Sequence, residues 1–428
     1  MRQARAGARP YTADRPQRTK EIEGAPMRRS VATCVSMMAG IMLASAAAAA
    51  EKKYDRGVTD EEITLGQTAP YSGPVSGYGT FGKASLAYFA MINDQGGVNG
   101  RKIKLISVDD AFNPSKTVER TRKLVESDGI FFDYAPVGTS PNLAVKQYLN
   151  DGKIPQLLLQ SGIPSWNDPA HFPWSMSGLP NYATEVRVFV KYILNAKPNA
   201  RIALLYQDDD FGKEYLDGMR SRLGSQAEKM LVDAQSFELT DPTVDSQMVT
   251  LAASGADVLL IAATQKQTVQ ALRKAYQLDW HPLKFIAFPA VSVTRTYLPA
   301  GVEASKGAIS SSVFVDPSDP TLQNDADILA YLAWMEKYYP AGDKLDILNA
   351  AAYVEGQIVV EVLKRCGDLL TRENVMKQAA GFHQFRAAML HPGITVDTSP
   401  DDYNMFKRLQ LMTFDGQYLT SVGAPIGD

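Results

Sequence analysis

Short apolar runs alternate with amphipathic stretches along most of the chain, beginning near Val58. Runs rich in β-branched residues and leucine are typical of buried strands, and apolar residues three and four positions apart are typical of helices. Strands that alternate with helices form βαβ units around a parallel sheet. We therefore predict an α/β fold.

Two series of this kind follow one another. The first has predicted strands at residues 63–67, 103–108, 130–132 and 156–159, and predicted helices at 79–94, 115–126 and 142–150. The second has predicted strands at 202–206, 231–237, 258–261 and 285–288, and predicted helices at 215–223, 243–253 and 267–278. The stretch 162–181 between them is rich in Pro, Trp and Asn and is long for a connector. We predict that it crosses between two doubly wound lobes.

After residue 300 helices dominate, and we expect them to cover the two lobes without forming a third domain. The predicted elements are helices at 326–338, 349–364 and 372–379 and a last strand at 407–414.

The N-terminal 50 residues have the order of an export signal. Met27 to Ser30 is basic, Val31 to Leu43 is mostly apolar, and Ser45 to Ala50 is a tract of small residues. The apolar run is about 13 residues, whereas a membrane span needs roughly 20. We predict a signal region at 1–50, with Met27 as the true start, cleavage after Ala50 and release into the periplasm. A membrane anchor is the less favoured alternative.

Charge and cysteine content narrow the function further. The chain carries a formal net charge of −3, and residues 1–50 hold 8 basic and 3 acidic residues, so the remainder carries −8. An acidic chain disfavours a nucleic-acid partner. Cys34 lies in the signal region and Cys366 stays alone, so the exported chain has no internal disulfide. We expect a monomer stabilised by packing.

An enzyme is the distant alternative, suggested by the glycine pattern Gly77, Gly79 and Gly82. In a dinucleotide fold this pattern directly follows the strand, and an acid follows about 20 positions later. Here residues 70–76 intervene, and Asp109 lies 32 positions after Gly77. An NAD-dependent oxidoreductase is therefore disfavoured, and we expect no enzyme activity and no cofactor.

No metal site is expected either. The four histidines are scattered, and the run Asp208 to Asp210 fits a solvated loop with a helix N-cap better than a cation site.

A parallel sheet binds ligands beyond the carboxyl ends of its strands, where helix N-termini present free N–H groups. Glycines and small polar residues follow the predicted strands and leave room for a ligand carboxylate. Each of them alone fits a cap or a turn, and the argument is their convergence. The predicted ligand-binding residues are Ser72, Tyr78, Gly138, Thr139, Gln160, Ser161 and Gly162 in the first lobe, and Phe211, Gln265 and Ala290 in the second.

Several segments carry a family resemblance. Residues 69–74 followed by Tyr78 and Gly79 resemble the opening of the branched-chain amino-acid binding proteins of ATP-binding-cassette importers. The segments 96–102, 109–114 and 206–214 also resemble that family, and the likeness extends from about Val58 to Gly416.

The resemblance implies a type I periplasmic binding protein, in which two doubly wound parallel-sheet lobes are joined by three crossing segments. The lobes close around a small solute, and the protein then docks on a membrane permease. The implied limits are 54–178 plus 312–390 for the N-terminal lobe and 179–311 plus 391–428 for the C-terminal lobe. A transport protein is preferred over a sensory receptor ectodomain.

The resemblance also implies roles for single residues. It places the Thr139 hydroxyl on the ligand carboxylate, Ser161 and Gly162 in the neighbouring loop, and the rings of Tyr78 and Phe211 around the ligand.

One departure from the family bears on the ligand. Amino-acid binders of this family place an acid after the strand equivalent to 285–288, where this sequence has Pro289, Ala290 and Val291. A buried ammonium without a counter-charge is costly. We therefore predict an aromatic or aliphatic organic acid, for which Trp166 and Tyr182 offer further stacking faces. The alternative is a branched-chain or other amino acid, paired with an acid elsewhere in the cleft.

Overall fold

The computed structural model describes residues 52–427, so the predicted signal region and its cleavage site lie outside the described residues. Within these residues no helix combines the length and apolarity needed to cross a membrane.

The first sheet has five parallel strands in the order β3-β2-β4-β5-β6. The strands are β2 (Glu62–Ala69), β3 (Lys102–Asp109), β4 (Phe132–Tyr134), β5 (Gln156–Leu159) and β6 (Ser175–Ser177). The strand order reverses between β2 and β4, and this reversal opens a crevice at their carboxyl ends.

The second sheet repeats this plan with the parallel order β8-β7-β9-β10-β11. These strands are β7 (Ile202–Gln207), β8 (Leu231–Phe237), β9 (Val258–Ala262), β10 (Leu283–Ile286) and β11 (Ile309–Ser312). Three antiparallel strands then extend the edge beyond β11, namely β13 (Arg408–Phe414), β14 (Leu419–Ser421) and β15 (Ile426–Gly427). The sheet is thus mixed, and its own reversal lies between β7 and β9.

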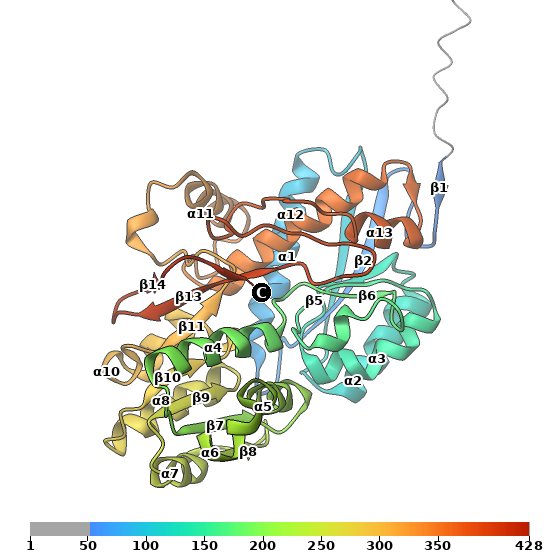
Figure 1. Ribbon diagram of the computed structural model, residues 1–428. Helices are drawn as coiled ribbons and strands as arrows, with labels where there is room; N and C mark the ends of the chain where they lie inside the picture. The colour runs from blue at the N-terminus through green and yellow to red at the C-terminus, as the bar shows by residue number, and fades with distance from the viewer. Residues whose placement is uncertain (1–51, 428) are drawn as a thin grey trace, which may run out of the picture. The chain divides into compact units, whose positions relative to one another are not determined.

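Helices cover both sheets (Figure 1). Those beside the first sheet are α1 (Gly79–Asp94), α2 (Pro114–Arg122) with its π-helical continuation Lys123–Ser127, α3 (Thr139–Asp151), α11 (Ala326–Tyr338), α12 (Ile347–Cys366) and α13 (Arg372–Ala379). Those beside the second are α4 (Tyr182–Ala196), α5 (Asp210–Leu223), α7 (Asp245–Ala253) and α8 (Gln265–Gln277), with the short helices α6 (Ala227–Met230), α9 (Leu298–Ala300) and α10 (Val302–Ser305).

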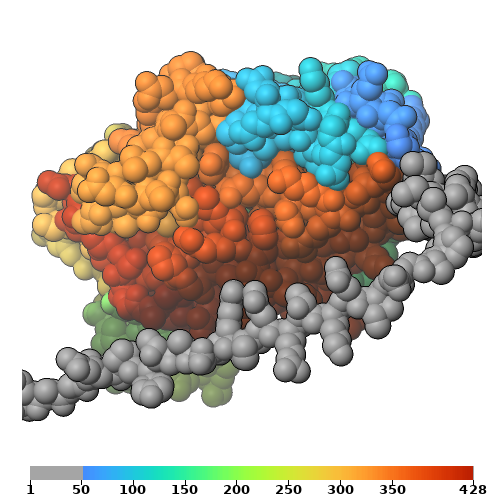
Figure 2. All heavy atoms as spheres, turned by 90° about the horizontal axis from the view of Figure 1, so that it is seen from above, coloured from blue at the N-terminus to red at the C-terminus, as the bar shows by residue number. Residues whose placement is uncertain are grey.

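C-terminal helices complete the core of the N-terminal lobe. The Tyr88 ring of α1 meets the rings of Trp334 and Tyr353 edge-on, with centroids 6.2 and 5.3 Å away. Such edge-to-face pairs add to the free energy gained by burying the rings. Figure 2 shows one face of the molecule, on which the orange and red C-terminal part of the chain lies beside blue N-terminal residues.

The chain passes between the sheets three times within the described residues, from β6 to α4, from β11 to α11 and from α13 to β13. The second and third passages pair with each other. Val315 N–H donates to the Met389 carbonyl at 2.9 Å, and His391 N–H donates to the Val313 carbonyl at 3.0 Å. This arrangement is the expected two-lobed α/β fold, and the exact limits of each lobe stay a prediction.

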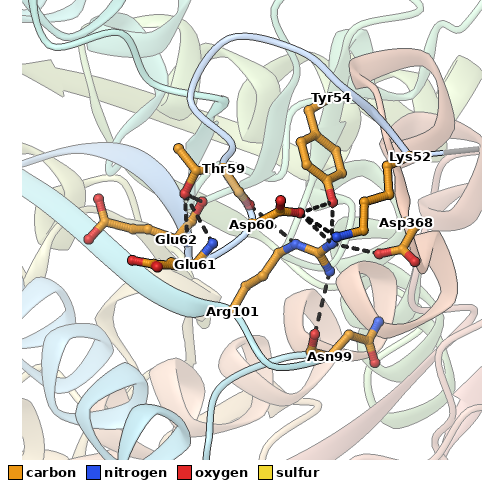
Figure 3. Close-up of polar contacts among 9 residues, drawn as sticks. All are labelled: Lys52, Tyr54, Thr59, Asp60, Glu61, Glu62, Asn99, Arg101 and Asp368. Atoms are coloured by element: carbon orange, nitrogen blue, oxygen red, sulfur yellow. Dashed lines mark hydrogen bonds and ion pairs between the residues drawn. The ribbon is translucent and has the colours of Figure 1, made fainter.

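A buried arginine fastens the start of the described chain. Arg101 is 3% exposed, and its guanidinium donates to the Asp368 carboxylate at 2.6 Å, to the Tyr54 hydroxyl and to the Thr59 carbonyl at 3.2 Å (Figure 3). The strand β1 (Lys53–Tyr54) pairs with β12 (Leu369–Leu370) beside it. Segments far apart in sequence are therefore held together by one side chain.

Most predicted elements agree with the structure, and the differences have local causes. The helices predicted at 79–94, 326–338 and 372–379 match α1, α11 and α13 at both ends. The strand predicted at 130–132 lies at 132–134, because residues 128–131 form an irregular connection after the helix. The strand predicted at 285–288 ends at Ile286, since Pro289 lacks an N–H and a 3-10 helix (Phe288–Ala290) follows. The stretch 162–181 is not purely a connector, because its residues 175–177 form β6.

Candidate ligand-binding site

A cavity lies between the carboxyl ends of the two sheets. About 840 Å³ of space lies between its walls, part of it open to solvent. Its lining is mostly apolar, with a few polar side chains. The lining residues are Tyr78, Phe81, Phe112, Val137, Gly138, Thr139, Gln160, Leu179, Tyr182, Gln207, Asp209, Phe211, Thr264, Phe288, Pro289, Val291, Ser312, Phe314, Ile347, Leu348 and Ala351.

The strand order explains why these residues meet. The chain leaving β4 supplies Gly138 and Thr139, and the chain leaving β2 leads to Tyr78. On the opposite side, β7 is followed by Asp209 and β9 by Thr264. Both reversal points therefore face one cavity, as the geometry of open parallel sheets requires.

The start of α3 forms the polar end of the N-terminal lobe's wall. Its N-cap is Gly138, with a φ of 107°, and no side chain caps the helix. A Cβ at Gly138 would lie 2.3 Å from the Phe112 ring, so the position needs glycine. The first N–H groups of a helix lack partners within the helix and favour anions. The Thr139 and Ser140 amides are therefore suited to a carboxylate.

The Thr139 hydroxyl is held by a short chain of hydrogen bonds. Thr139 Oγ1 lies 2.8 Å from Ser161 Oγ, which also accepts the Trp166 indole N–H at 2.8 Å. When Ser161 donates to Thr139, the Thr139 O–H is free to donate into the cavity. Ser161 and Trp166 are thus placed behind the wall, where they orient Thr139.

The opposite wall carries a carboxylate. Asp209 Oδ1 accepts the Gly212 N–H at 3.1 Å, while Oδ2 accepts Gln207 Nε2 at 2.6 Å and the Ser140 hydroxyl at 3.2 Å. Burial raises the pKa of Asp209, and these hydrogen bonds oppose the rise. Gln207 is 3% exposed and its Oε1 has no hydrogen-bond partner in the described part of the chain. The Asp209 carboxylate therefore lies at the cavity without a cationic partner among residues 52–427, while Gln207 Oε1 is an unpaired acceptor buried within the wall.

A second buried carboxyl supports this wall from behind. Glu185, 1% exposed, accepts the Ser311 hydroxyl at 2.5 Å, the Tyr215 hydroxyl, and the Phe288 N–H at 3.2 Å. Burial raises the pKa of Glu185 to about 7 against these hydrogen bonds. Glu185 thereby fixes the end of β10, from which Phe288 and Pro289 reach the cavity.

A third carboxyl lies under the N-terminal lobe's wall. Gln160 Nε2 donates to both carboxyl oxygens of Glu355 at 2.7 Å. Burial raises the pKa of Glu355 well above its ordinary value. The contact fixes the Gln160 amide at the cavity.

Five of the ten predicted ligand-binding residues line the cavity, namely Tyr78, Gly138, Thr139, Gln160 and Phe211. The Tyr182 ring, predicted as a stacking face, lines it too. Whether these residues bind the ligand stays a prediction.

The other five lie off the wall. Ser72 is exposed, and its hydroxyl donates to Asp109 at 2.5 Å. Ser161 is buried behind Thr139, and Gly162 packs so tightly that a Cβ would lie 2.1 Å from the Pro180 carbonyl. Ala290 is buried in the core of the second sheet. Gln265 lines a smaller neighbouring hollow with Lys266 and Arg295.

Sequence reasoning missed Asp209 and Gln207 as wall residues. Asp209 does cap α5, as expected of the run 208–210, but it is largely withdrawn from solvent and not in a solvated loop. The available signal was its position directly after a strand beside the sheet's reversal point.

The described residues offer no metal centre at this cavity. Within 52–427 no group of three or more His, Cys, Asp or Glu side chains is arranged to hold a metal ion.

Comparisons with known proteins agree with this architecture. A family model described as periplasmic binding protein matches residues 62–417. The Leu/Ile/Val-binding protein homolog 3 of Brucella melitensis is 23% identical over 358 residues, covering 81% of this chain and 91% of the relative. The Leu/Ile/Val-binding protein BraC3 of Rhizobium johnstonii is 27% identical over 172 residues, which span 38% of this chain and 44% of that protein.

Two solved structures share the fold. A branched-chain amino acid ABC transporter protein from Thermus thermophilus with bound valine has a TM-score of 0.78 at 18% identity, covering 87% of this chain and 98% of that chain. A fatty acid ABC transporter substrate-binding protein from Thermomonospora curvata has a TM-score of 0.74 at 19% identity, covering 88% and 95%.

Proposed function

Because the chain belongs to the periplasmic binding protein family, we propose that it is the solute-binding component of an ATP-binding-cassette importer. In this role it is exported to the periplasm, captures a small carboxylate-bearing ligand between its two lobes, and delivers it to a membrane permease. The function is binding and not catalysis.

One observation carries the proposal: the cavity is lined both by the uncapped N-terminus of α3 and by mostly apolar side chains. The α3 start offers N–H groups and the Thr139 hydroxyl to a carboxylate. Rings from both lobes, including Tyr78 and Phe211, leave an apolar space for the rest of the ligand. An anionic head with an apolar body fits this combination.

An α-amino acid with an apolar side chain is the favoured ligand. The Asp209 carboxylate stands on the opposite wall of the cavity, and an ammonium would supply the cation that it lacks. This supports the amino-acid alternative, because the acid absent from residues 288–291 has a substitute at 209. The Leu/Ile/Val-binding names of the relatives are consistent with it.

An aromatic or aliphatic organic acid is the second candidate. Asp209 already accepts three hydrogen bonds, and a carboxylate has about four acceptor sites, so the protein itself satisfies most of this carboxylate without a ligand ammonium. The walls of the cavity are strongly apolar, and the Thermomonospora curvata protein of the same fold is named as the substrate-binding protein of a fatty acid ABC transporter.

Calorimetry on three matched ligands tests the proposal. L-leucine has both charged groups, 4-methylpentanoate lacks the ammonium, and 3-methylbutylamine lacks the carboxylate. We expect L-leucine to bind at least about tenfold more tightly than either analogue, since each lost charged contact costs about 1.5 kcal/mol or more. The same comparison with phenylalanine, 3-phenylpropanoate and phenethylamine covers aromatic ligands.

Equal binding of the acid and the amino acid would establish the organic-acid candidate. If no carboxylate-bearing ligand of either set raises the melting temperature, the cavity does not serve the proposed function.

A further inference from the structure

An ion pair joins the two lobes beside the ligand cavity. Arg295 follows β10 of the second sheet, in the π-helical turn Val293–Tyr297, and its Nε donates to the Asp346 carboxylate. Asp346 directly precedes α12, which lies beside the first sheet. The Asp346 side chain is fully buried, whereas the Arg295 side chain is 30% exposed. The pair therefore bridges the lobes with its acidic member sealed from solvent.

Each partner is fixed within its own lobe. Asp346 Oδ1 caps α12 by accepting a backbone N–H of the first turn. The Asn349 side chain in that turn accepts the Thr80 hydroxyl of α1 at 2.9 Å. In the other lobe, the Arg295 N–H donates to Ser292 Oγ at 3.1 Å and holds the start of the π-helical turn. A large separation of the lobes must therefore break the pair.

The pair adjoins the ligand cavity. Tyr78 and Thr264 line both that cavity and the smaller hollow where Arg295 stands. Ile347, the residue after Asp346, lines the ligand cavity as well. Breaking the pair therefore loosens the boundary of the cavity itself.

The charge balance of the pair favours the closed arrangement. Burial raises the pKa of Asp346, and the Arg295 charge opposes the rise. Removing one partner of a buried ion pair leaves an uncompensated charge, which is strongly unfavourable. Separated lobes would let water solvate the Asp346 carboxylate, so the loss of Arg295 should favour opening.

We propose that the Arg295–Asp346 pair is a latch that keeps the lobes closed in the free protein and slows the release of a bound ligand. The first part concerns the free protein and does not depend on what the ligand is. The second part rests on the proposed function, because it needs a ligand in the cavity.

Small-angle scattering of the free, exported chain tests the first part. Arg295→Met removes the charge and keeps a long side chain, so we expect a larger radius of gyration than in the wild type. Arg295→Gln also lacks the charge and should give the same result. Adding Asp346→Asn to Arg295→Met removes the uncompensated charge, and asparagine still caps a helix, so the radius should return towards the wild-type value.

The rate of ligand dissociation tests the second part, with L-leucine and 4-methylpentanoate as probes. Arg295→Met should release a bound probe about tenfold faster or more, because the closed state is destabilised. Lys266→Met removes an exposed cation of the same hollow without touching the pair, and it should change neither the radius nor the rate.

Three results would overturn the latch. They are an unchanged radius in both folded Arg295 variants, an equal opening in Lys266→Met, and a double variant that opens as far as Arg295→Met. An opened Arg295→Met that releases the probe at the wild-type rate would overturn the second part alone. If neither probe binds to the wild type, the proposed function fails, whereas the scattering of the free protein still decides whether the latch exists.

Discussion

The Tyr78 hydroxyl donates to the Pro289 carbonyl at 2.8 Å and so joins the two lobes beside the ligand cavity that both residues line. Tyr78 ends the 3-10 helix Ser76–Tyr78 that precedes α1, whereas Pro289 follows β10 of the other sheet. Burial raises the pKa of Tyr78 far above its ordinary value, so the phenol stays a donor at all working pH values.

Tyr78→Phe should weaken ligand binding by about 0.5–1.5 kcal/mol, the usual net contribution of one hydrogen bond. Without that bond the lobes should spend more time apart, so small-angle scattering of the free variant should give a larger radius of gyration. Tyr276→Phe changes a half-exposed tyrosine on α8 and serves as the control. Unchanged affinity and scattering would show that the contact does not hold the lobes closed.

Thr139→Ala should weaken a carboxylate ligand by about 0.5–3 kcal/mol, spanning an ordinary to a charge-assisted hydrogen bond. Calorimetry measures the loss. The exposed Thr250→Ala on α7 is the control, since its hydroxyl bonds only to the Ser246 carbonyl. An affinity equal to that of the wild type would remove Thr139 from the predicted site.

Asp209→Asn should weaken an amino-acid ligand about tenfold or more and leave its deaminated analogue no weaker, because only the ammonium loses a counter-charge. Asparagine caps helices as well as aspartate does, so α5 should keep its start. Asp210→Asn changes the exposed neighbour in the same turn and is the matched control. If the amino acid binds equally well to Asp209→Asn, the ammonium partner lies elsewhere.

Glu185 should make stability depend on pH. Its pKa is about 7 in the folded protein and 4.5 ordinarily, so between these values the folded state binds a proton that the unfolded state has lost. The free energy of unfolding should therefore fall as pH rises from about 4.5 through about 7, by on the order of 3 kcal/mol.

Denaturant unfolding at several pH values measures this effect. Glu185→Gln should show a smaller fall, because Glu355 and Asp209 also have raised pKa values and keep their contributions, whereas the exposed Glu303→Gln should retain the full fall. The prediction is wrong if the two variants show parallel pH profiles.

Arg101→Met should lower the free energy of unfolding by about 2 kcal/mol, because the Asp368 and Tyr54 contacts of a buried guanidinium are lost. Lys104→Met on the same strand is the control, since the Lys104 side chain is exposed and 3.9 Å from Glu62. Urea unfolding compares the two variants. An equal effect of both would mean that the Arg101 contacts do not stabilise the fold.

The local pattern of the sequence determined most of the secondary structure. Residues 79–94 have apolar positions at helical spacing and form α1 over that span, and the runs at 202–206 and 258–261 form neighbouring parallel strands. These features are predictable because amphipathic periodicity and β-branched runs act over a few residues. The sequence also pointed to glycines and hydroxyls after strands, of which Gly138 and Thr139 reach the cavity.

Only the tertiary structure decided which strand ends meet. Asp209 follows β7 and faces Thr139 across the cavity because both sheets reverse their order there, a relationship between segments about 70 residues apart that no local pattern encodes. The same holds for Val315 and Met389, whose backbones pair because two passages between the sheets lie side by side. Burial then sets the pKa values of groups such as Asp209 and Glu185, because desolvation depends on everything packed around a side chain and not on its neighbours in sequence.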